Sequence, residues 1–231
     1  MPLATLRRKF PLFAGFGRSE FESLEKCLVR RRYSCGQTLF HMGDEGGSLH
    51  LIERGRVKVT IPSTSGEELI LAILGGGELL GELSLFDGKP RSATVQALET
   101  TETFCLHRKD FLALLRNRFD IVEKLLEVLA RRIRETNALL ADRYFLDITS
   151  RLAKKILDLG DAFGIQEGRQ VRIGVNITQK NLASMIGATR ESINKQFKAF
   201  RDQDLVRACG GTIVILNREG LVRKASIFPK P

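Results

Sequence analysis

A short polar run in the first half of the chain has the residue types and spacing to hold a small charged ligand. Glu82 follows Gly81, and Arg91 and Ser92 stand nine and ten residues after Glu82. Arg presents a fork of N–H donors that suits a phosphate, and Ser adds a hydroxyl. A carboxylate would repel a phosphate, so we expect Glu82 to accept hydrogen bonds from sugar hydroxyls. The run therefore predicts a nucleotide site. A surface ion pair between Glu82 and Arg91 is the alternative, and residue types do not separate the two.

A second group of residues, 177–200, has the pattern of two short helices joined by a tight turn. Thr178 and Thr189 can each cap a helix, and Gly187 can supply the turn between them. The apolar positions that the two helices would share are Leu182, Ile186, Ile193 and Phe197. This layout predicts a helix-turn-helix.

The expected second helix carries side chains that could read a major groove. Its outward residues are Arg190, Glu191, Asn194, Lys195 and Lys198. Arg can pair with guanine, and Glu can accept from the cytosine amino group. Alternatively, Glu191 has no role in reading bases and stabilises its own helix, because a carboxylate in the first turn interacts favourably with the helix dipole. Four further residues are placed for phosphate contacts, which position a helix without specifying sequence: Thr178, Gln179, Lys180 and Thr189.

A long helix is expected between these two groups, over Asp110–Tyr144, which contains no Gly or Pro. At about 1.5 Å per residue it would be roughly 50 Å long. Apolar residues follow a seven-residue repeat: Val122, Leu126, Leu129, Ile133, Leu140 and Tyr144. Such a seam predicts a homodimer through the same helix of a second copy. Thr136 interrupts the seam, with Asn137 beside it. This gap either fixes the register of the dimer or faces a polar ligand.

The helices need a scaffold on the N-terminal side. After a helix pair that extends to about Val29, β-favouring runs occur at 38–40, 49–52, 57–61, 69–74, 94–97 and 103–106, and glycines separate most of them. This spacing predicts an antiparallel sandwich or roll.

On the C-terminal side, Asp147 is expected to cap a helix from Ile148 to Leu159. Residues 160–168 are expected to form a loop, and residues 205–215 are expected to form a two-stranded wing.

Composition narrows the class of protein. No run of about 18 apolar residues exists, and Met1–Phe10 has no secretory pattern, so we expect a cytoplasmic protein. Four scattered cysteines, Cys27, Cys35, Cys105 and Cys209, include no Cys-x-x-Cys pair, and His41, His50 and His107 show no ligand spacing. A metal site and a disulfide framework are therefore not expected.

Positive charge is concentrated at the C-terminal end of the chain. Residues 1–108 carry 14 Lys and Arg against 13 Asp and Glu, and residues 109–145 carry 8 against 6. Residues 146–231 carry 15 against 8, which accounts for +7 of the net charge of +10. The excess predicts that a polyanion binds the C-terminal part.

The first half of the chain resembles a known family. The segments Tyr33–Gly36, Gly43-Asp44, Leu49-His-Leu-Ile and Gly55-x-Val57 resemble the cyclic-nucleotide-binding domain. The cassette Gly81-Glu82-Leu83 with Arg91-Ser92-Ala93 is the most specific part, and it resembles the CRP/FNR family of bacterial transcription regulators. The resemblance implies a β-roll in which Glu82 binds a ribose hydroxyl and Arg91 and Ser92 bind a cyclic phosphate. Backbone N–H groups from Gly81 to Leu83 would assist.

The resemblance continues through Leu129 to Asn137 and into the helix-turn-helix. It implies that Thr136 meets an adenine, while Asn137 meets it from the partner subunit. Asn137 stands where the best-known activator has Ser, and Asn offers both a donor and an acceptor for contact with the adenine. Thr-Arg-Glu-x-x-x-Lys resembles the recognition pattern Ser-Arg-Glu-x-x-x-Arg. Lys195 replaces the usual Arg there, which indicates a different preferred base.

Together these observations predict an α+β protein with three parts: a β-roll at 1–108, a dimerisation helix at 109–145, and a winged helix-turn-helix at 146–231. The expected function is that of a homodimeric, cAMP-responsive regulator of transcription, not an enzyme. Double-stranded palindromic DNA and RNA polymerase are its expected partners. Alternatives are a sensor of cGMP, a cyclic dinucleotide, haem or redox state, a ligand-independent DNA binder, and a cyclic-nucleotide subunit of an enzyme or channel.

Overall fold

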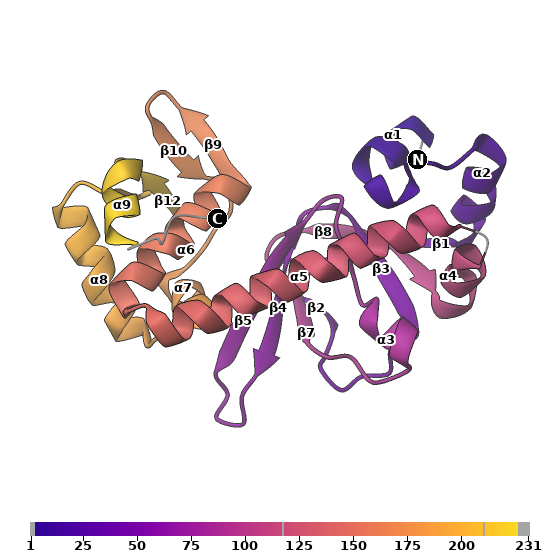
Figure 1. Ribbon diagram of the computed structural model, residues 1–231, viewed down its shortest axis with the longest axis horizontal. Coiled ribbons are helices and arrows are strands. Elements are labelled where there is room, and N and C mark those ends of the chain that lie inside the picture. Colours follow the sequence, from indigo (N-terminus) through magenta and orange to yellow (C-terminus); the bar gives the residue numbers. More distant parts are fainter. Residues whose placement is uncertain (1–2, 117, 210, 226–231) are drawn as a thin grey trace. The chain divides into compact units, whose positions relative to one another are not determined.

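The computed structural model describes residues 3–116, 118–209 and 211–225. The chain divides into two compact units, Met1–Arg134 and Glu135–Pro231. Helix α5 (Phe119–Phe145) contributes to both units. Each unit is described by itself below. Figure 1 labels the helices and strands in both.

The first unit is a β-roll made of two four-stranded antiparallel sheets. One sheet has the order β1-β8-β3-β6, and the other has the order β2-β7-β4-β5. The strands are β1 (Leu28–Tyr33), β2 (Thr38–Phe40), β3 (Ser48–Arg54), β4 (Arg56–Pro62), β5 (Glu68–Gly75), β6 (Leu79–Leu80), β7 (Thr94–Ala97) and β8 (Thr101–His107). The predicted roll is confirmed, although the expected strands did not include β1 and β6.

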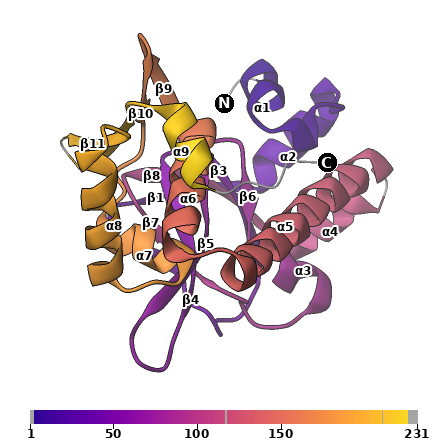
Figure 2. The same cartoon turned by 60° about the vertical axis from the view of Figure 1, so that its left-hand side comes forward.

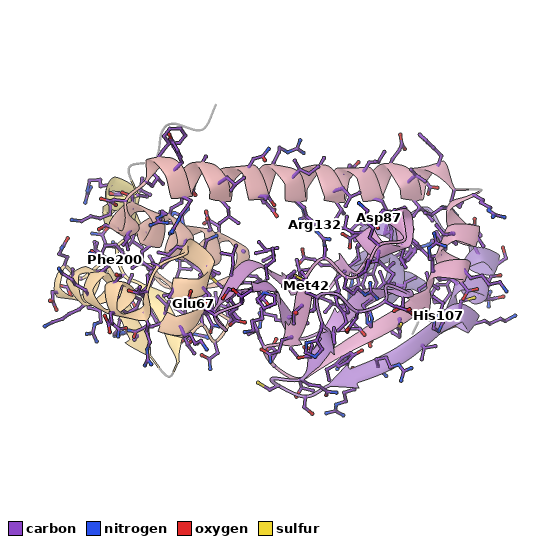
Figure 3. The ribbon with its side chains drawn as sticks, turned by 90° about the horizontal axis from the view of Figure 1, so that it is seen from below. Met42, Glu67, Asp87, His107, Arg132 and Phe200 are labelled. Carbon is purple, nitrogen blue, oxygen red and sulfur yellow. The ribbon has the colours of Figure 1, made fainter. Side chains whose placement is uncertain are left out.

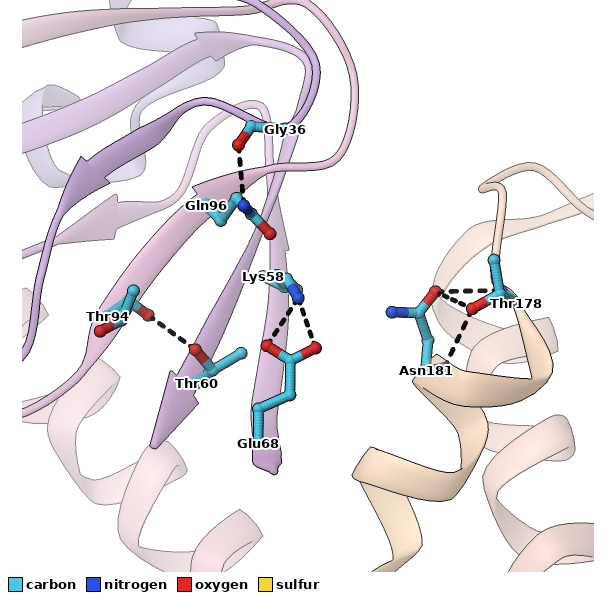
Figure 4. A network of polar contacts seen from close by, with 8 residues as sticks. All are labelled: Gly36, Lys58, Thr60, Glu68, Thr94, Gln96, Thr178 and Asn181. Carbon is cyan, nitrogen blue, oxygen red and sulfur yellow. Dashed lines mark hydrogen bonds and ion pairs between the residues drawn. The ribbon is translucent and has the colours of Figure 1, made fainter. Parts of the chain in front are cut away.

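Strand β3 is buried on both faces because it lies between two cores. Leu49 and Leu51 belong to a cluster with the N-terminal helices α1 (Leu3–Lys9) and α2 (Arg18–Cys27) and with the 3₁₀ turn Pro11–Phe13. Ile52 belongs to a second, smaller cluster inside the roll, with Val57 of β4 and Val95 of β7 among its members. The hairpin of β4 and β5 is tied by Lys58, whose ammonium donates to Glu68 Oε2 at 2.7 Å (Figure 4).

The single helix expected over 110–144 is wrong in its first part. The structure has two helices, α4 (Arg108–Leu115) and α5. The break is stabilised by Arg118, whose guanidinium pairs with Glu20 of α2 and, at 2.6 Å, with Asp120. The same guanidinium lies 4.4 Å from the centre of the Phe16 ring. These contacts fasten the N-terminal helices to the start of α5. The continuous helix has 27 residues, which gives about 40 Å.

The second unit packs helices against a four-stranded antiparallel sheet of order β11-β12-β10-β9. Its helices are α6 (Ile148–Phe163), α7 (Gln179–Ile186), α8 (Arg190–Asp202) and α9 (Arg218–Lys224) (Figure 2). Asp147 caps α6 as expected, because its Oδ1 accepts from Ser150 N at 2.7 Å. The expected wing is confirmed as β11 (Val206–Cys209) and β12 (Thr212–Ile215).

The loop expected at 160–168 is wrong. Helix α6 continues to Phe163, and a hairpin of β9 (Gly164–Glu167) and β10 (Gln170–Ile173) follows directly. The polar residues of β9 are all exposed, so the segment lacks the apolar alternation that reveals a strand in a sequence. Pairing with β10, which in turn pairs with β12, makes it a strand.

Candidate functional site

The backbone of the predicted nucleotide site turns sharply at Gly81, which has φ +84. A Cβ atom at this position would lie 2.3 Å from Nη1 of Arg91, so no other residue fits without displacing the arginine. The short helix α3 (Leu83–Asp87) begins directly after Glu82, which is its N-cap. The turn thereby brings the backbone of Gly81 against Arg91.

Arg91 is buried, with 4% of its surface exposed. Its Nη1 donates to Gly81 O at 2.8 Å, and its Nη2 donates to Ser48 O at 2.7 Å and to Ser48 Oγ at 3.3 Å. The guanidinium carbon lies 4.2 Å from the centre of the Phe40 ring. Burial lowers the pKa of Arg91, while Cys105, Glu82 and Asp44 act in the opposite direction. The Nε atom is buried and has no hydrogen-bond partner among the described residues.

Glu82 is also buried, with 2% of its surface exposed. Its Oε1 accepts from Nη1 of Arg132 on α5, and Nη2 of Arg132 donates to Leu79 O at 2.6 Å. Its Oε2 has no partner among the described residues. The alternative of a surface ion pair between Glu82 and Arg91 is therefore wrong, because both side chains are buried and the carboxylate pairs with Arg132.

The two unsatisfied atoms have opposite hydrogen-bonding characters. Arg91 Nε is a cationic donor, and Glu82 Oε2 is an anionic acceptor. A buried polar atom without a partner is unfavourable, so such atoms indicate a missing ligand or water. A molecule with an anionic oxygen and a hydroxyl group at separate ends satisfies both atoms. A cyclic nucleotide has these two groups.

The other residues predicted for this site are less enclosed. Leu83 and Ser92 are exposed, and both adjoin residues that are buried in the site. Thr136 and Asn137 are exposed on α5, and they belong to the second unit. Their contact with a ligand stays a prediction.

The sequence analysis did not predict Arg132 as a residue of this site. Its side chain extends from α5 on the side of the helix where Asp87 lies (Figure 3). Its signal was a cation four residues before Thr136, one helical turn away. Ser48, Phe40 and His50 were also missed as parts of the site. Phe40 lies on β2, whereas Ser48 and His50 lie on β3, and no local motif links these strands to the cassette.

In the second unit, the predicted helix caps are present. Thr178 Oγ1 accepts from Asn181 N at 3.1 Å, and Asn181 Oδ1 accepts from Thr178 N at 3.0 Å (Figure 4). Thr189 Oγ1 accepts from Ser192 N at 3.2 Å. Gly187 closes α7 with φ +61, the left-handed conformation that the tight turn requires.

The outer face of α8 carries the predicted base-reading residues, and all five are exposed: Arg190, Glu191, Asn194, Lys195 and Lys198. Its inner face is buried through Ile193, Phe197 and Phe200. Arg190 also lines a groove of about 500 Å³, together with Thr178, Gln179 and Lys180 of the first helix and Gly211 of the wing. The structure thus gathers one base-reading candidate and three of the four phosphate-contact candidates, whereas Thr189 does not line this groove.

The turn of the helix-turn-helix is held by two arginines from outside it. Nη1 of Arg151 on α6 donates to Ile186 O at 2.8 Å. Nη1 of Arg143, in the last turns of α5, donates to Gly187 O. The last carbonyls of α7 are therefore paired with cations, which also interact favourably with the helix dipole.

Comparison with known proteins matches two parts of the chain to known domain families. Residues 30–118 match the cyclic nucleotide-binding domain family, and residues 150–224 match the Crp-like helix-turn-helix domain family. The chain is 36% identical over 214 residues to the CRP-like cAMP-activated global transcriptional regulator of Mycobacterium tuberculosis, covering 93% of this chain and 96% of that protein. The chain belongs to the CRP/FNR family of transcription regulators.

Two further proteins to which this CRP/FNR regulator is similar, one in sequence and one in fold, are named after different cyclic nucleotides. The cyclic AMP receptor protein of Thermus thermophilus is 34% identical over 205 residues, covering 89% of this chain and 92% of that protein. The c-di-GMP responsive global regulator CLP of Xanthomonas campestris has a similar fold, with a TM-score of 0.75 and 22% identity over 87% of this chain and all of that chain.

The family membership establishes a DNA-binding regulator of transcription with a cyclic nucleotide-binding domain, rather than an enzyme. In the part of the chain that the structure describes, we find no helix with the length and apolarity to cross a membrane. Across the same residues, no group of three His, Cys, Asp or Glu side chains is placed to hold a metal ion.

Proposed function

We propose that this CRP/FNR regulator is a homodimer that responds to cAMP. One observation carries the proposal: Arg91 Nε and Glu82 Oε2 belong to one cassette, and both are buried without a hydrogen-bond partner in the part of the chain that the structure describes. The cyclic phosphate would accept from Arg91 Nε, and the ribose 2′-hydroxyl would donate to Glu82 Oε2. The names of two relatives, the CRP-like cAMP-activated regulator of Mycobacterium tuberculosis and the cyclic AMP receptor protein of Thermus thermophilus, support the choice of nucleotide.

The phosphate ester carries one negative charge, and Arg91 is the cation buried beside its expected position. Its two terminal nitrogens are already anchored to Gly81 O and Ser48 O, so the guanidinium is oriented before the ligand arrives. Glu82 is oriented in the same way by Arg132. A preorganised site loses less conformational entropy on binding. Ser92 would add its hydroxyl to the phosphate, and Thr136 and Asn137 would meet the adenine.

A second copy of the chain is the expected partner of α5. Four of its apolar side chains recur every seven residues and are largely exposed: Phe119 70%, Leu126 58%, Ile133 61% and Leu140 66%. This spacing is that of a coiled-coil seam. The Thr136 and Asn137 pair lies within the seam, so a ligand bound there would be shared between two subunits.

The ligand would act through its preference for one arrangement of the dimer. In that arrangement the two α8 helices would enter successive major grooves, about 34 Å apart on a palindromic operator. Contact with RNA polymerase remains part of this proposal.

Calorimetry with cAMP, cGMP and c-di-GMP tests the choice of effector. We expect cAMP to bind most tightly, and Arg91→Ala to lose at least tenfold in affinity, because a hydrogen bond to a charged group contributes about 1.5–3 kcal/mol. Lys89→Ala is the matched control, since Lys89 lies in the same loop and is exposed. Equal cAMP binding by Arg91→Ala and the parent protein would contradict the proposed pocket. Tighter binding of c-di-GMP would assign a different effector.

A further inference from the structure

The interior of the β-roll has a polar end beside Arg91. Ser48 and His50 lie two residues apart on β3, so their side chains share one face. Thr103 lies on the neighbouring strand β8, which pairs with β3. His50 is 6% exposed and Thr103 is fully buried. The rings of Phe40 and Tyr33 lie 5.8 Å and 6.5 Å from the His50 ring. This polar end is defined here by Ser48, His50 and Thr103.

A series of hydrogen-bonding contacts connects this polar end to the guanidinium of Arg91. Arg91 Nη2 donates to Ser48 Oγ at 3.3 Å. Ser48 Oγ lies 3.5 Å from His50 Nε2, and His50 Nδ1 lies 3.4 Å from Thr103 Oγ1. Arginine can only donate, so the lone pair of the Ser48 hydroxyl faces Arg91 and its hydrogen is free to face His50. The hydroxyl can then donate to Nε2, and in that tautomer the imidazole hydrogen lies on Nδ1, where it donates to Thr103.

This arrangement requires a neutral His50, and the surroundings favour one. Burial, Arg91 and Arg31 together lower the pKa of His50 from 6.5 to about 4. Tyr33 of β1 and Cys105 of β8 interact electrostatically with each other. Cys105, Glu82 and Asp44 interact electrostatically with Arg91. Burial raises the pKa of Tyr33. At neutral pH the cationic group of the cluster is therefore Arg91, with Arg31 of β1 nearby.

We propose that His50 is a positioning residue of the effector site, which acts through the Ser48 hydroxyl to hold Arg91 in the orientation that leaves Nε for a phosphate. The inference rests on the proposed function and adds a residue to it. Without an acceptor at position 50, the Ser48 hydroxyl turns its hydrogen elsewhere, and its lone pair no longer fixes Nη2. The guanidinium then keeps only backbone anchors and can rotate about them.

A double-mutant cycle measured by calorimetry with cAMP tests this role. His50→Phe keeps an aromatic ring but removes the acceptor, and Ser48→Ala keeps the carbonyl that also anchors Arg91. We expect each to weaken cAMP binding about tenfold, as the loss of one hydrogen bond implies. We expect the double variant to be no weaker than either single variant, because both changes break the same connection. His50→Gln restores an acceptor and should bind within about threefold of the parent.

Each outcome has a stated meaning. Unchanged binding by His50→Phe, or losses that multiply in the double variant, would overturn the positioning role. Urea unfolding of each variant checks that the fold is retained. If His50→Phe does not fold, Ser48→Ala with parental affinity would overturn the role by itself. If the parent protein binds no cyclic nucleotide, the proposed function is contradicted. If the parent protein and His50→Phe bind cAMP with equal affinity, only this inference is contradicted.

Discussion

Burying a charged side chain is unfavourable unless its polar atoms find partners. Arg91 and Glu82 meet this condition only in part, because each keeps one buried atom without a partner among the described residues. The cost is offset by fixed contacts around them: Ser48 and Gly81 carbonyls for the arginine, and Arg132 for the carboxylate. At the scale of single residues, Arg91 and Glu82 are therefore opposite charges held by fixed contacts, and in the proposed function each uses its remaining polar atom to bind the ligand.

A second prediction at this scale concerns DNA recognition by Arg190 of α8. Arg190→Ala should lose discrimination at one guanine by about 1–3 kcal/mol, since a bidentate contact of arginine with guanine has that magnitude. Competition binding to a set of operators that differ at one base pair measures this. Arg201→Ala is the control, because Arg201 is exposed near the other end of α8. An equal loss on every sequence would make Arg190 a phosphate contact instead.

Among the elements, the turn before α3 determines where Arg91 lies. The close approach of Nη1 to Gly81 is possible because this residue has no Cβ and tolerates φ +84. The start of α3 then carries Glu82 to the same place. The loop and the short helix therefore act as one unit that brings a carboxylate and a guanidinium together.

Gly81→Ala tests the importance of this turn. We expect a loss of about 1–3 kcal/mol in unfolding free energy and weaker cAMP binding, because a strained backbone and a displaced Arg91 act together. Gly88→Ala separates backbone strain from displacement of a neighbouring side chain, because Gly88 has φ +69 but a Cβ atom there would meet no atom within 4 Å. Chemical denaturation and calorimetry measure both variants. If Gly81→Ala weakens cAMP binding no more than Gly88→Ala does, the close approach to Arg91 has no role in binding.

For the whole molecule, the main consequence concerns association of two copies. The exposed row from Phe119 to Leu140 would be unfavourable in water on an isolated chain. Ile133→Asp should convert the proposed dimer into a monomer at micromolar concentration, because each isoleucine buried in the interface would contribute about 1.5–3 kcal/mol and a dimer contains two. Sedimentation velocity measures the mass. Arg134→Asp is the neighbouring control. A dimer that persists in Ile133→Asp would place the subunit interface elsewhere.

The sequence alone determined most of the elements and the order of the motifs, but not β1, β6, the hairpin of β9 and β10, or the break between α4 and α5. Local signals sufficed for this: the caps at Asp147, Thr178 and Thr189, the glycine turns, and the seven-residue repeat depend on residues close together in the chain. The tertiary structure decided which side chains meet Arg91 and Glu82. Ser48 is 43 positions from Arg91 and Arg132 is 50 from Glu82, so these pairs form only when the strands pair and α5 packs on the roll. The interruption of the long helix at Arg118 has the same origin, because its partner Glu20 lies 98 positions away.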